Sequence, residues 1–214
     1  DDDLKIPERA IVKIDLGAHV DGYISDHAKT FLVKPTESYR ELKRVAELAL
    51  ENAVNFVKPG IRPGDIGEVI ENTIREEEYI PITDLTGHVI ERWTLHAGTS
   101  IPNHKPMFGF LGPKLKVGQV LAIEPFVTTP DGSEKIYDES YSYIFSQTGT
   151  KAKTDDAKKI VKEIKKYRNL PFALRWLEGI FSETRIFSAL KELLSYNALT
   201  RYPMLVSESQ TPVA

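Results

Sequence analysis

Two aspartates that interrupt a predicted β-hairpin constrain this chain more than any other feature. Residues 11–16 are strand-like, Asp21-Gly22 is the signal of a two-residue turn, and residues 23–31 return as the partner strand. Aspartate is disfavoured inside strands, so Asp15 and Asp26 need an explanation. With this turn, position 15 pairs with 28 and position 17 with 26, which puts both carboxylates on one face. Two anions so close repel each other unless a cation neutralises them. The alternative is that one of them caps a turn or contacts a lysine.

Hydrophobic periodicity predicts two helices after the hairpin. The first opens after Thr36 as a long amphipathic helix and is stopped by Pro59-Gly60. The second begins at Asp65, which forms a capping box with Glu68, and runs through Ile74. A mixed region of strands and loops then extends to residue 145, and its best strand covers residues 117–123.

The composition changes after Gly149, where three further helices are predicted. Thr154 caps a basic helix and Pro171 begins a short one. The apolar residues of the third helix are Ile186, Phe187, Leu190, Leu193 and Leu194. Residues 199–207 are strand-like again. The predicted fold class is therefore α/β, or α+β, with a helical insertion near the end of the chain.

Composition excludes several classes of protein. The 28 basic and 31 acidic residues leave a net charge of −3, which argues against a chain that coats nucleic acid or an anionic membrane. No apolar run approaches the ~18 residues that a membrane span needs. The absence of cysteine excludes disulfide frameworks, thiolate catalysis and Cys-ligated zinc. Any metal ion must therefore bind to Asp, Glu and His side chains.

Three further side chains could join the two aspartates in a metal site. His88 and His96 lie eight residues apart, beside glycines and outside any predicted helix, and Glu124 ends the strand-like stretch before Pro125. A set of two Asp, one Glu and one His is rich in oxygen and suits Mn, Co, Fe or Zn. Three carboxylates exceed what one divalent ion needs. They indicate two ions that share a bridging water, as in dinuclear hydrolases.

The residues around these side chains resemble the type II methionine aminopeptidases of the M24 family, particularly archaeal members. The resemblance follows the family's order and spacing over nearly the whole chain. Its segments are 13–17 with 19–26, Gly87-His88, His96-Ala97-Gly98 with 100–103, and 122–126. Type I members are shorter, lack the helical insertion and usually carry His-Glu where His96-Ala97 stands. The resemblance implies the pita-bread α/β sandwich, with a catalytic core at residues 1–145, a winged-helix-like insertion at 146–206 and a return strand at 207–214.

The same resemblance implies a hydrolase, a metallo-exopeptidase that removes methionine from the N-termini of nascent polypeptides. Asp15, Asp26, His88 and Glu124 would be the ligands of two divalent metal ions (Co, Mn, Fe or Zn), and Asp26 would bridge both ions. His96 would contact the substrate at the scissile amide, and Leu95 would help to line the methionine pocket. The implied protein is a cytoplasmic monomer, with nascent chains and the ribosome as partners and neither a membrane nor a nucleic acid.

Two features of the family are expected outside this sequence. A bridging Glu should follow the strand that residues 211–214 begin, and a substrate-binding His should precede Asp15. The sequence starts Asp1-Asp2-Asp3, without Met and without a signal peptide. We therefore expect a piece of a longer cytoplasmic protein that binds metal weakly and turns over little substrate by itself.

Three other interpretations compete with this one. The first is a non-catalytic binding protein with the same pita-bread fold, and the second is another enzyme of that fold, such as a prolidase. The third is a DNA-binding module in the last seventy residues. This interpretation is supported by eight basic residues between Lys151 and Arg168. Three acidic residues in the same stretch favour a solvated helix face instead.

Overall fold

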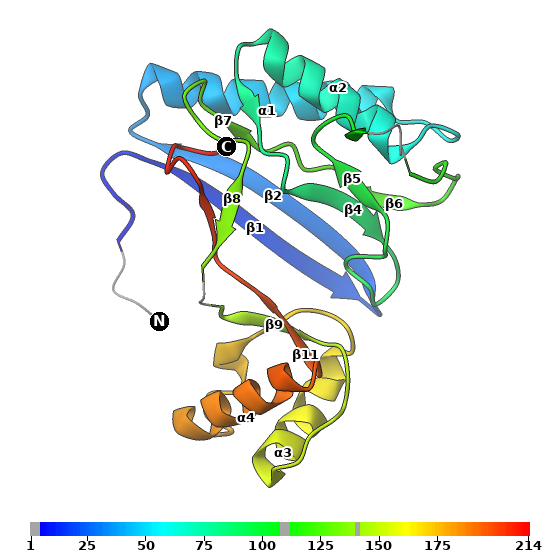
Figure 1. Ribbon diagram of the computed structural model, residues 1–214, viewed down its shortest axis with the longest axis vertical. Coiled ribbons are helices and arrows are strands. Elements are labelled where there is room, and N and C mark those ends of the chain that lie inside the picture. Colours follow the sequence, from blue (N-terminus) through cyan, green and yellow to red (C-terminus); the bar gives the residue numbers. More distant parts are fainter. Residues whose placement is uncertain (1–4, 108–111, 140–141) are drawn as a thin grey trace. The chain divides into compact units, whose positions relative to one another are not determined.

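The computed structural model describes residues 5–107, 112–139 and 142–214, and its packing divides the chain into two units (Figure 1). The first unit comprises the chain up to Arg92, His96–Tyr137 and Val206–Ala214, and the second comprises Trp93–Leu95 and Asp138–Leu205. Each unit has a buried hydrophobic core of its own. The predicted domain boundaries at residues 145 and 206 stay predictions. None of the described helices is both long and apolar enough to cross a membrane.

A long hairpin opens the first unit, as predicted. Its strands are β1 (Ala10–Val20) and β2 (Tyr23–Val33), which together form a two-stranded sheet of their own. The register pairs Asp15 with Ala28 and Gly17 with Asp26, which confirms the predicted pairing. The turn residues Asp21 and Gly22 have φ angles of 51° and 81°, the left-handed conformation that a tight two-residue turn requires.

Two helices supply most of the core of the first unit. They are α1 (Glu37–Phe56) and α2 (Pro63–Glu76), which pack side by side (Figure 1). Thr36 caps α1 as predicted, and its hydroxyl accepts a hydrogen bond from the backbone N–H of Tyr39 at 3.3 Å. The predicted start of α2 at Asp65 is wrong, because Pro63 suits the first position of a helix, where no backbone N–H is needed. Asp65 lies in the first turn instead and accepts from the N–H of Arg62 at 2.7 Å.

Short strands complete the first unit. In one sheet, β4 (Thr86–Ile90) lies between β5 (Ser100–Pro102) and β6 (Val120–Ala122). The strands β3 (Ile80–Pro81) and β7 (Val127–Thr128) form a further pair. The pair of β8 (Ile136–Asp138) with β12 (Leu205–Ser207) lies at the boundary of the units, since Asp138 and Leu205 are assigned to the second unit. The strand predicted over 117–123 is shorter than expected, because Gly118 turns the chain at a φ of 87° just before β6.

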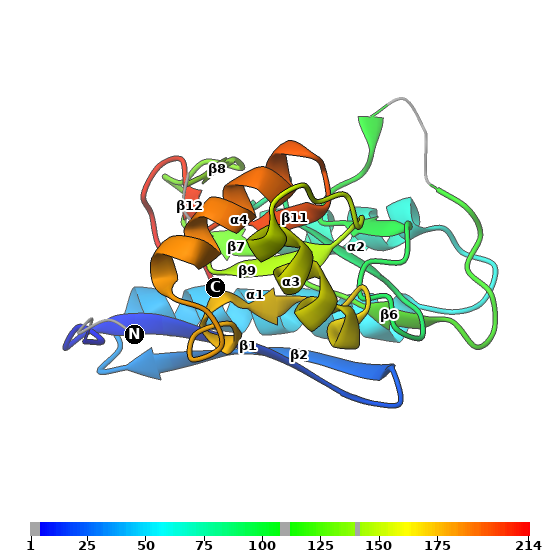
Figure 2. The same cartoon turned by 90° about the horizontal axis from the view of Figure 1, so that it is seen from below.

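The second unit packs two helices, α3 (Asp155–Ile164) and α4 (Glu183–Ser195), beside a small sheet (Figure 2). In that sheet, β9 (Ile144–Gln147) pairs with β10 (Phe172–Ala173) and β11 (Leu199–Tyr202). Thr154 caps α3 as predicted. Short 3-10 turns cover Lys165–Tyr167 and Leu174–Trp176. The helix predicted from Pro171 is wrong, because Phe172 pairs with Phe145 across the sheet and is buried in the core.

Candidate metal centre

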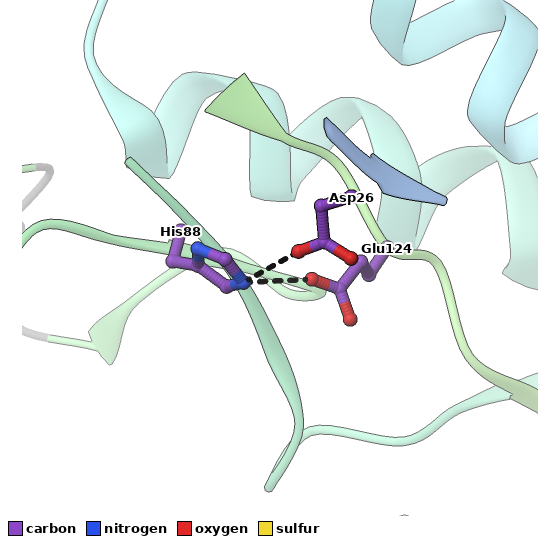
Figure 3. Close-up of side chains that lie close together, drawn as sticks. All are labelled: Asp26, His88 and Glu124. Carbon is purple, nitrogen blue, oxygen red and sulfur yellow. Dashed lines mark ion pairs between the residues drawn. The ribbon is translucent and has the colours of Figure 1, made fainter. Parts of the chain in front are cut away.

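Three side chains of the first unit, Asp26, His88 and Glu124, meet at one point (Figure 3). The Nε2 atom of His88 lies 3.4 Å from Oδ2 of Asp26 and 3.3 Å from Oε1 of Glu124. One potential ligand atom from each side chain lies within 4.8 Å of the other two. His88 is buried and both carboxylates are mostly buried, so this cluster of charge is shielded from bulk water.

Strand pairing brings His88 and Glu124 together. His88 lies on the central strand β4 opposite Ala122 of β6, and Glu124 follows Ala122 by two residues. The preceding residue, Gly87, allows the two strands to approach, because a Cβ atom there would lie 2.2 Å from the carbonyl oxygen of Ala122. Any side chain at position 87 would therefore push β6, and Glu124 with it, away from His88.

The hairpin contributes Asp26 from β2 and Asp15 from β1. Asp15 is not a member of the three-residue group, but it lines the same pocket of about 400 Å³ as Asp26 and Glu124. Burial raises the pKa of the Asp15 carboxyl, and the negative charges of Asp26 and Glu124 raise it further. Burial and then the charge of Glu124 likewise raise the pKa of Asp26. These carboxyl groups disfavour one another's ionisation, the repulsion that a bound cation would relieve.

His96 lies beside the three-residue group. Its ring centroid is 4.3 Å from that of His88, and the two rings meet edge to face at 70°. Burial lowers the pKa of His96, and the positive charge of His88 lowers it further. Burial alone would lower the pKa of His88 as well, but the hydrogen bond with Glu124 and the charges of Glu124 and Asp26 outweigh it and raise that pKa. The lowered pKa favours the neutral imidazole form of His96, which can donate one hydrogen bond.

The spacing of the three side chains fits a divalent metal ion. Imidazole nitrogen and carboxylate oxygen bind such ions at about 2.1 Å, so two ligands at the tetrahedral angle lie about 3.4 Å apart. The separations of 3.3 and 3.4 Å from His88 Nε2 match this value. One imidazole with two carboxylates is also a donor set that suits Zn, Fe, Co or Mn.

The predicted site residues are therefore brought together to different degrees. Asp26, His88 and Glu124 form the group, Asp15 lines the same pocket and the ring of His96 meets that of His88 edge to face. Leu95 is assigned to the second unit, and its role in a methionine pocket stays a prediction.

Sequence reasoning missed the cationic side of this pocket. Lys13, Lys29 and Lys43 all line it. Lys13 precedes Asp15 by two residues, so the alternation of side chains along a strand was a signal that could have found it. Lys43 lies on α1, and no local pattern relates that helix to the hairpin.

Comparisons with known proteins show the family to which this chain belongs. Residues 1–160 match the model of metallopeptidase family M24. The methionine aminopeptidase of Thermococcus onnurineus is 41% identical over 207 residues, which are 95% of this chain and 68% of that protein. The crystal structure of methionine aminopeptidase from Thermotoga maritima aligns with a TM-score of 0.55 and 36% identity over 61% of this chain and 51% of that chain.

A third protein is similar in fold alone. The structure of a thermophilic Arx1 aligns with a TM-score of 0.74 at 20% identity and covers 95% of this chain. The present chain spans 62% of that structure. Its share of the three compared proteins thus lies between 51% and 68% of their lengths.

Proposed function

This chain belongs to metallopeptidase family M24, and we propose that it removes the N-terminal methionine of newly made polypeptides in a metal-dependent hydrolysis. Its fold is the pita-bread metallopeptidase fold of that family. The observation that carries the proposal is the convergence of Asp26, His88 and Glu124 at metal-ligand spacing, in a chain 41% identical to a methionine aminopeptidase.

The proposed roles of the residues follow from their positions. Asp15 and Asp26 would hold one divalent ion, and Asp26, His88 and Glu124 would hold a second, with Asp26 shared between them. Bound ions of the Co, Mn, Fe or Zn type supply a water nucleophile that is ionised at neutral pH. The location of Asp26, His88 and Glu124 in a largely buried cluster supports their assignment, because partial exclusion of water strengthens the charge interactions within it.

His96 would act on the substrate and not on the metal. A neutral imidazole beside His88 can donate its N–H to the carbonyl oxygen of the scissile bond as negative charge develops there. Leu95 directly precedes it in the chain and would contribute apolar surface to the methionine side chain. The substrates would be nascent chains that begin with Met, met by a cytoplasmic monomer at or near the ribosome.

Methionine release tests this proposal. The protein that carries this sequence is incubated with Met-Ala-Ser and, as a blocked control, N-acetyl-Met-Ala-Ser, and free methionine is measured with Co²⁺ or Mn²⁺ present. We expect release from the free peptide only, its loss with EDTA, and its return with excess metal. Glu124→Gln should abolish it, whereas Glu178→Gln, a change in the second unit, should not.

The alternative of a non-catalytic binding protein predicts a different result. Such a protein would bind metal, measured by isothermal titration calorimetry, and release no methionine under any metal condition.

The variant His96→Ala tests whether His96 contacts the substrate or is a metal ligand in an active enzyme. It should leave the metal affinity unchanged and lower the turnover rate by about 10²–10³, the usual effect of losing one oxyanion donor. A fall in metal affinity for this variant would mean that His96 is a ligand.

A further inference from the structure

The turn of the hairpin is contacted by an arginine that follows the strand carrying His88. Arg92 lies two residues beyond the end of β4, and its Nε–H donates to the carbonyl oxygen of Asp21 at 2.8 Å. Its guanidinium carbon also lies 4.9 Å from the ring centroid of Tyr23, so its positive charge lies over the face of that ring in a cation–π contact. One side chain therefore contacts both sides of the two-residue turn that joins β1 to β2.

The hairpin needs such a contact because its own packing is sparse. β1 and β2 pair with each other, while β4 belongs to a different sheet. Large apolar side chains along the hairpin are exposed, among them Leu16 at 58%, Val20 at 79% and Tyr23 at 68%. A strand pair with little buried surface near its turn has few apolar contacts to hold that end in place.

Charge at the site adds a force that tends to move the hairpin. Asp15 and Asp26 lie on the hairpin and line the same pocket as Glu124. His88 contacts Asp26 and Glu124 and offsets part of their charge, but the like charges of the three carboxylates still oppose the approach of the hairpin to the chain segment after β6 when no cation is bound. Asp26 lies five residues from Asp21 along the same hairpin, about 16 Å in an extended strand. A contact at the turn can therefore limit the movement of Asp26 relative to His88.

We propose that Arg92 is a positioning residue for the metal centre, which fixes the carboxylates of the hairpin at ligand distance from His88 through its contacts with Asp21 and Tyr23. This inference rests on the proposed function, since it assumes that Asp26 and His88 share a metal ion. Arg92 touches neither the metal ligands nor the substrate in this role. Its effect is to keep the site formed before the ion arrives, so that binding does not have to order the hairpin.

Removing Arg92 has two effects on the affinity for a metal cation, and they have opposite signs. The sign of the measured change therefore tests the proposal. Loss of a positive charge near an acidic site should by itself tighten the binding of a cation. Loss of the positioning contact should weaken it, by about 10-fold if Arg92 matters as much as other residues that orient metal ligands. A weaker affinity therefore cannot be explained by the change in charge.

The experiment measures the affinity of the protein that carries this sequence for Co²⁺ alone. Isothermal titration calorimetry gives the dissociation constant, and the visible absorption bands of bound Co²⁺ report its coordination. The variants are Arg92→Ala and Arg92→Lys, with Arg40→Ala as the matched control. Arg40 pairs with Glu37 at 2.9 Å on the exposed side of α1, so its removal changes the net charge equally. The melting temperature without metal is recorded for every variant.

We expect Arg92→Ala to bind Co²⁺ about 10-fold more weakly and to show altered absorption bands. Arg92→Lys should be intermediate, because lysine can still donate to a carbonyl but lacks the planar guanidinium group. If Arg92→Ala melts too low to be measured, the lysine variant carries the test. Equal or tighter binding by a folded Arg92 variant would overturn the inference alone. No Co²⁺ binding by the unaltered protein would instead overturn the proposed function.

Discussion

The metal centre requires a residue without a side chain at position 87 as much as it requires the ligand side chains. Gly87 has no Cβ atom, and the carbonyl oxygen of Ala122 occupies the place where one would be, at 2.2 Å. Glycine is thus required here for close approach of two backbones and not for an unusual backbone angle. Gly17 offers a natural comparison, because a Cβ atom there would meet the carbonyl oxygen of Ser25 at an ordinary 3.5 Å.

Alanine substitution at these two glycines should therefore have opposite effects on stability. Gly87→Ala should lower the free energy of unfolding by about 1–3 kcal/mol, because the added methyl group forces β6 away from β4. Gly17→Ala should raise it by roughly 0.5–1 kcal/mol, the gain usual for replacing glycine inside a strand. Urea titration followed by circular dichroism measures both. A Gly87→Ala protein as stable as the unaltered one would show that β4 and β6 are not this close.

Among the secondary-structure elements, α3 shows how one distant side chain can add to a local helix cap. Glu192 of α4 accepts the backbone N–H groups of Lys153 and Thr154, and the hydroxyl of Thr154 donates to it at 2.7 Å. These hydrogen bonds, that of Lys153 first, lower the pKa of Glu192 below its usual value. The carboxylate thus ties the N-terminus of α3 to α4.

The contribution of Glu192 to stability should depend on pH. Because its pKa is lower in the folded state, the stabilisation is present above the pKa of the unfolded chain, near 4.3, and is lost as pH falls through the folded value. Glu192→Gln should therefore be less stable than the unaltered protein at pH 7, and the difference should shrink below pH ~4.3.

Thermal melting across pH 3–7 checks this behaviour, with Glu178→Gln as the control. Glu178 is an exposed glutamate of the same unit for which no carboxylate hydrogen bond is described. A difference for Glu192→Gln that stays constant from pH 7 to pH 3 would mean that its charge is not what holds the helix.

At the scale of the whole molecule, the most important feature for stability is that the two units have separate hydrophobic cores. The core of the first unit contains residues of α1 and α2, and that of the second contains residues of α3, α4 and the β9–β11 region. Asp26, His88 and Glu124 all belong to the first unit. A ligand that binds only the native state stabilises it, by about 2.7 kcal/mol at a hundred times its dissociation constant.

Metal should therefore stabilise the two units unequally. We expect excess Co²⁺ to slow amide hydrogen exchange in β4 and β6, which flank the site, and to leave exchange in α3 and α4 unchanged. Hydrogen-exchange mass spectrometry with and without Co²⁺ measures both regions in one sample. Equal slowing in both units would show that they unfold as a single cooperative unit.

Local sequence patterns determined several elements of this protein without help from the fold. The Asp-Gly turn sets the register of the hairpin, and that register puts Asp15 and Asp26 on one face. Thr36 and Thr154 mark the starts of α1 and α3 for a similar reason, since a cap is a hydrogen bond within one turn of chain. Each of these features depends on residues close together in the sequence.

Features that depend on distant residues were decided only by the tertiary structure. Phe172 is a strand residue because Phe145 lies opposite it, although Pro171 locally favours a helix. The spacing of the metal-ligand side chains likewise depends on residues that are distant in the sequence. Asp26, His88 and Glu124 are identifiable as candidates one by one, but their separations of 3.3 and 3.4 Å follow from the pairing of β4 with β6 and the approach of the hairpin. Such long-range contacts form only when the chain closes large loops, and no local pattern encodes the distance across them.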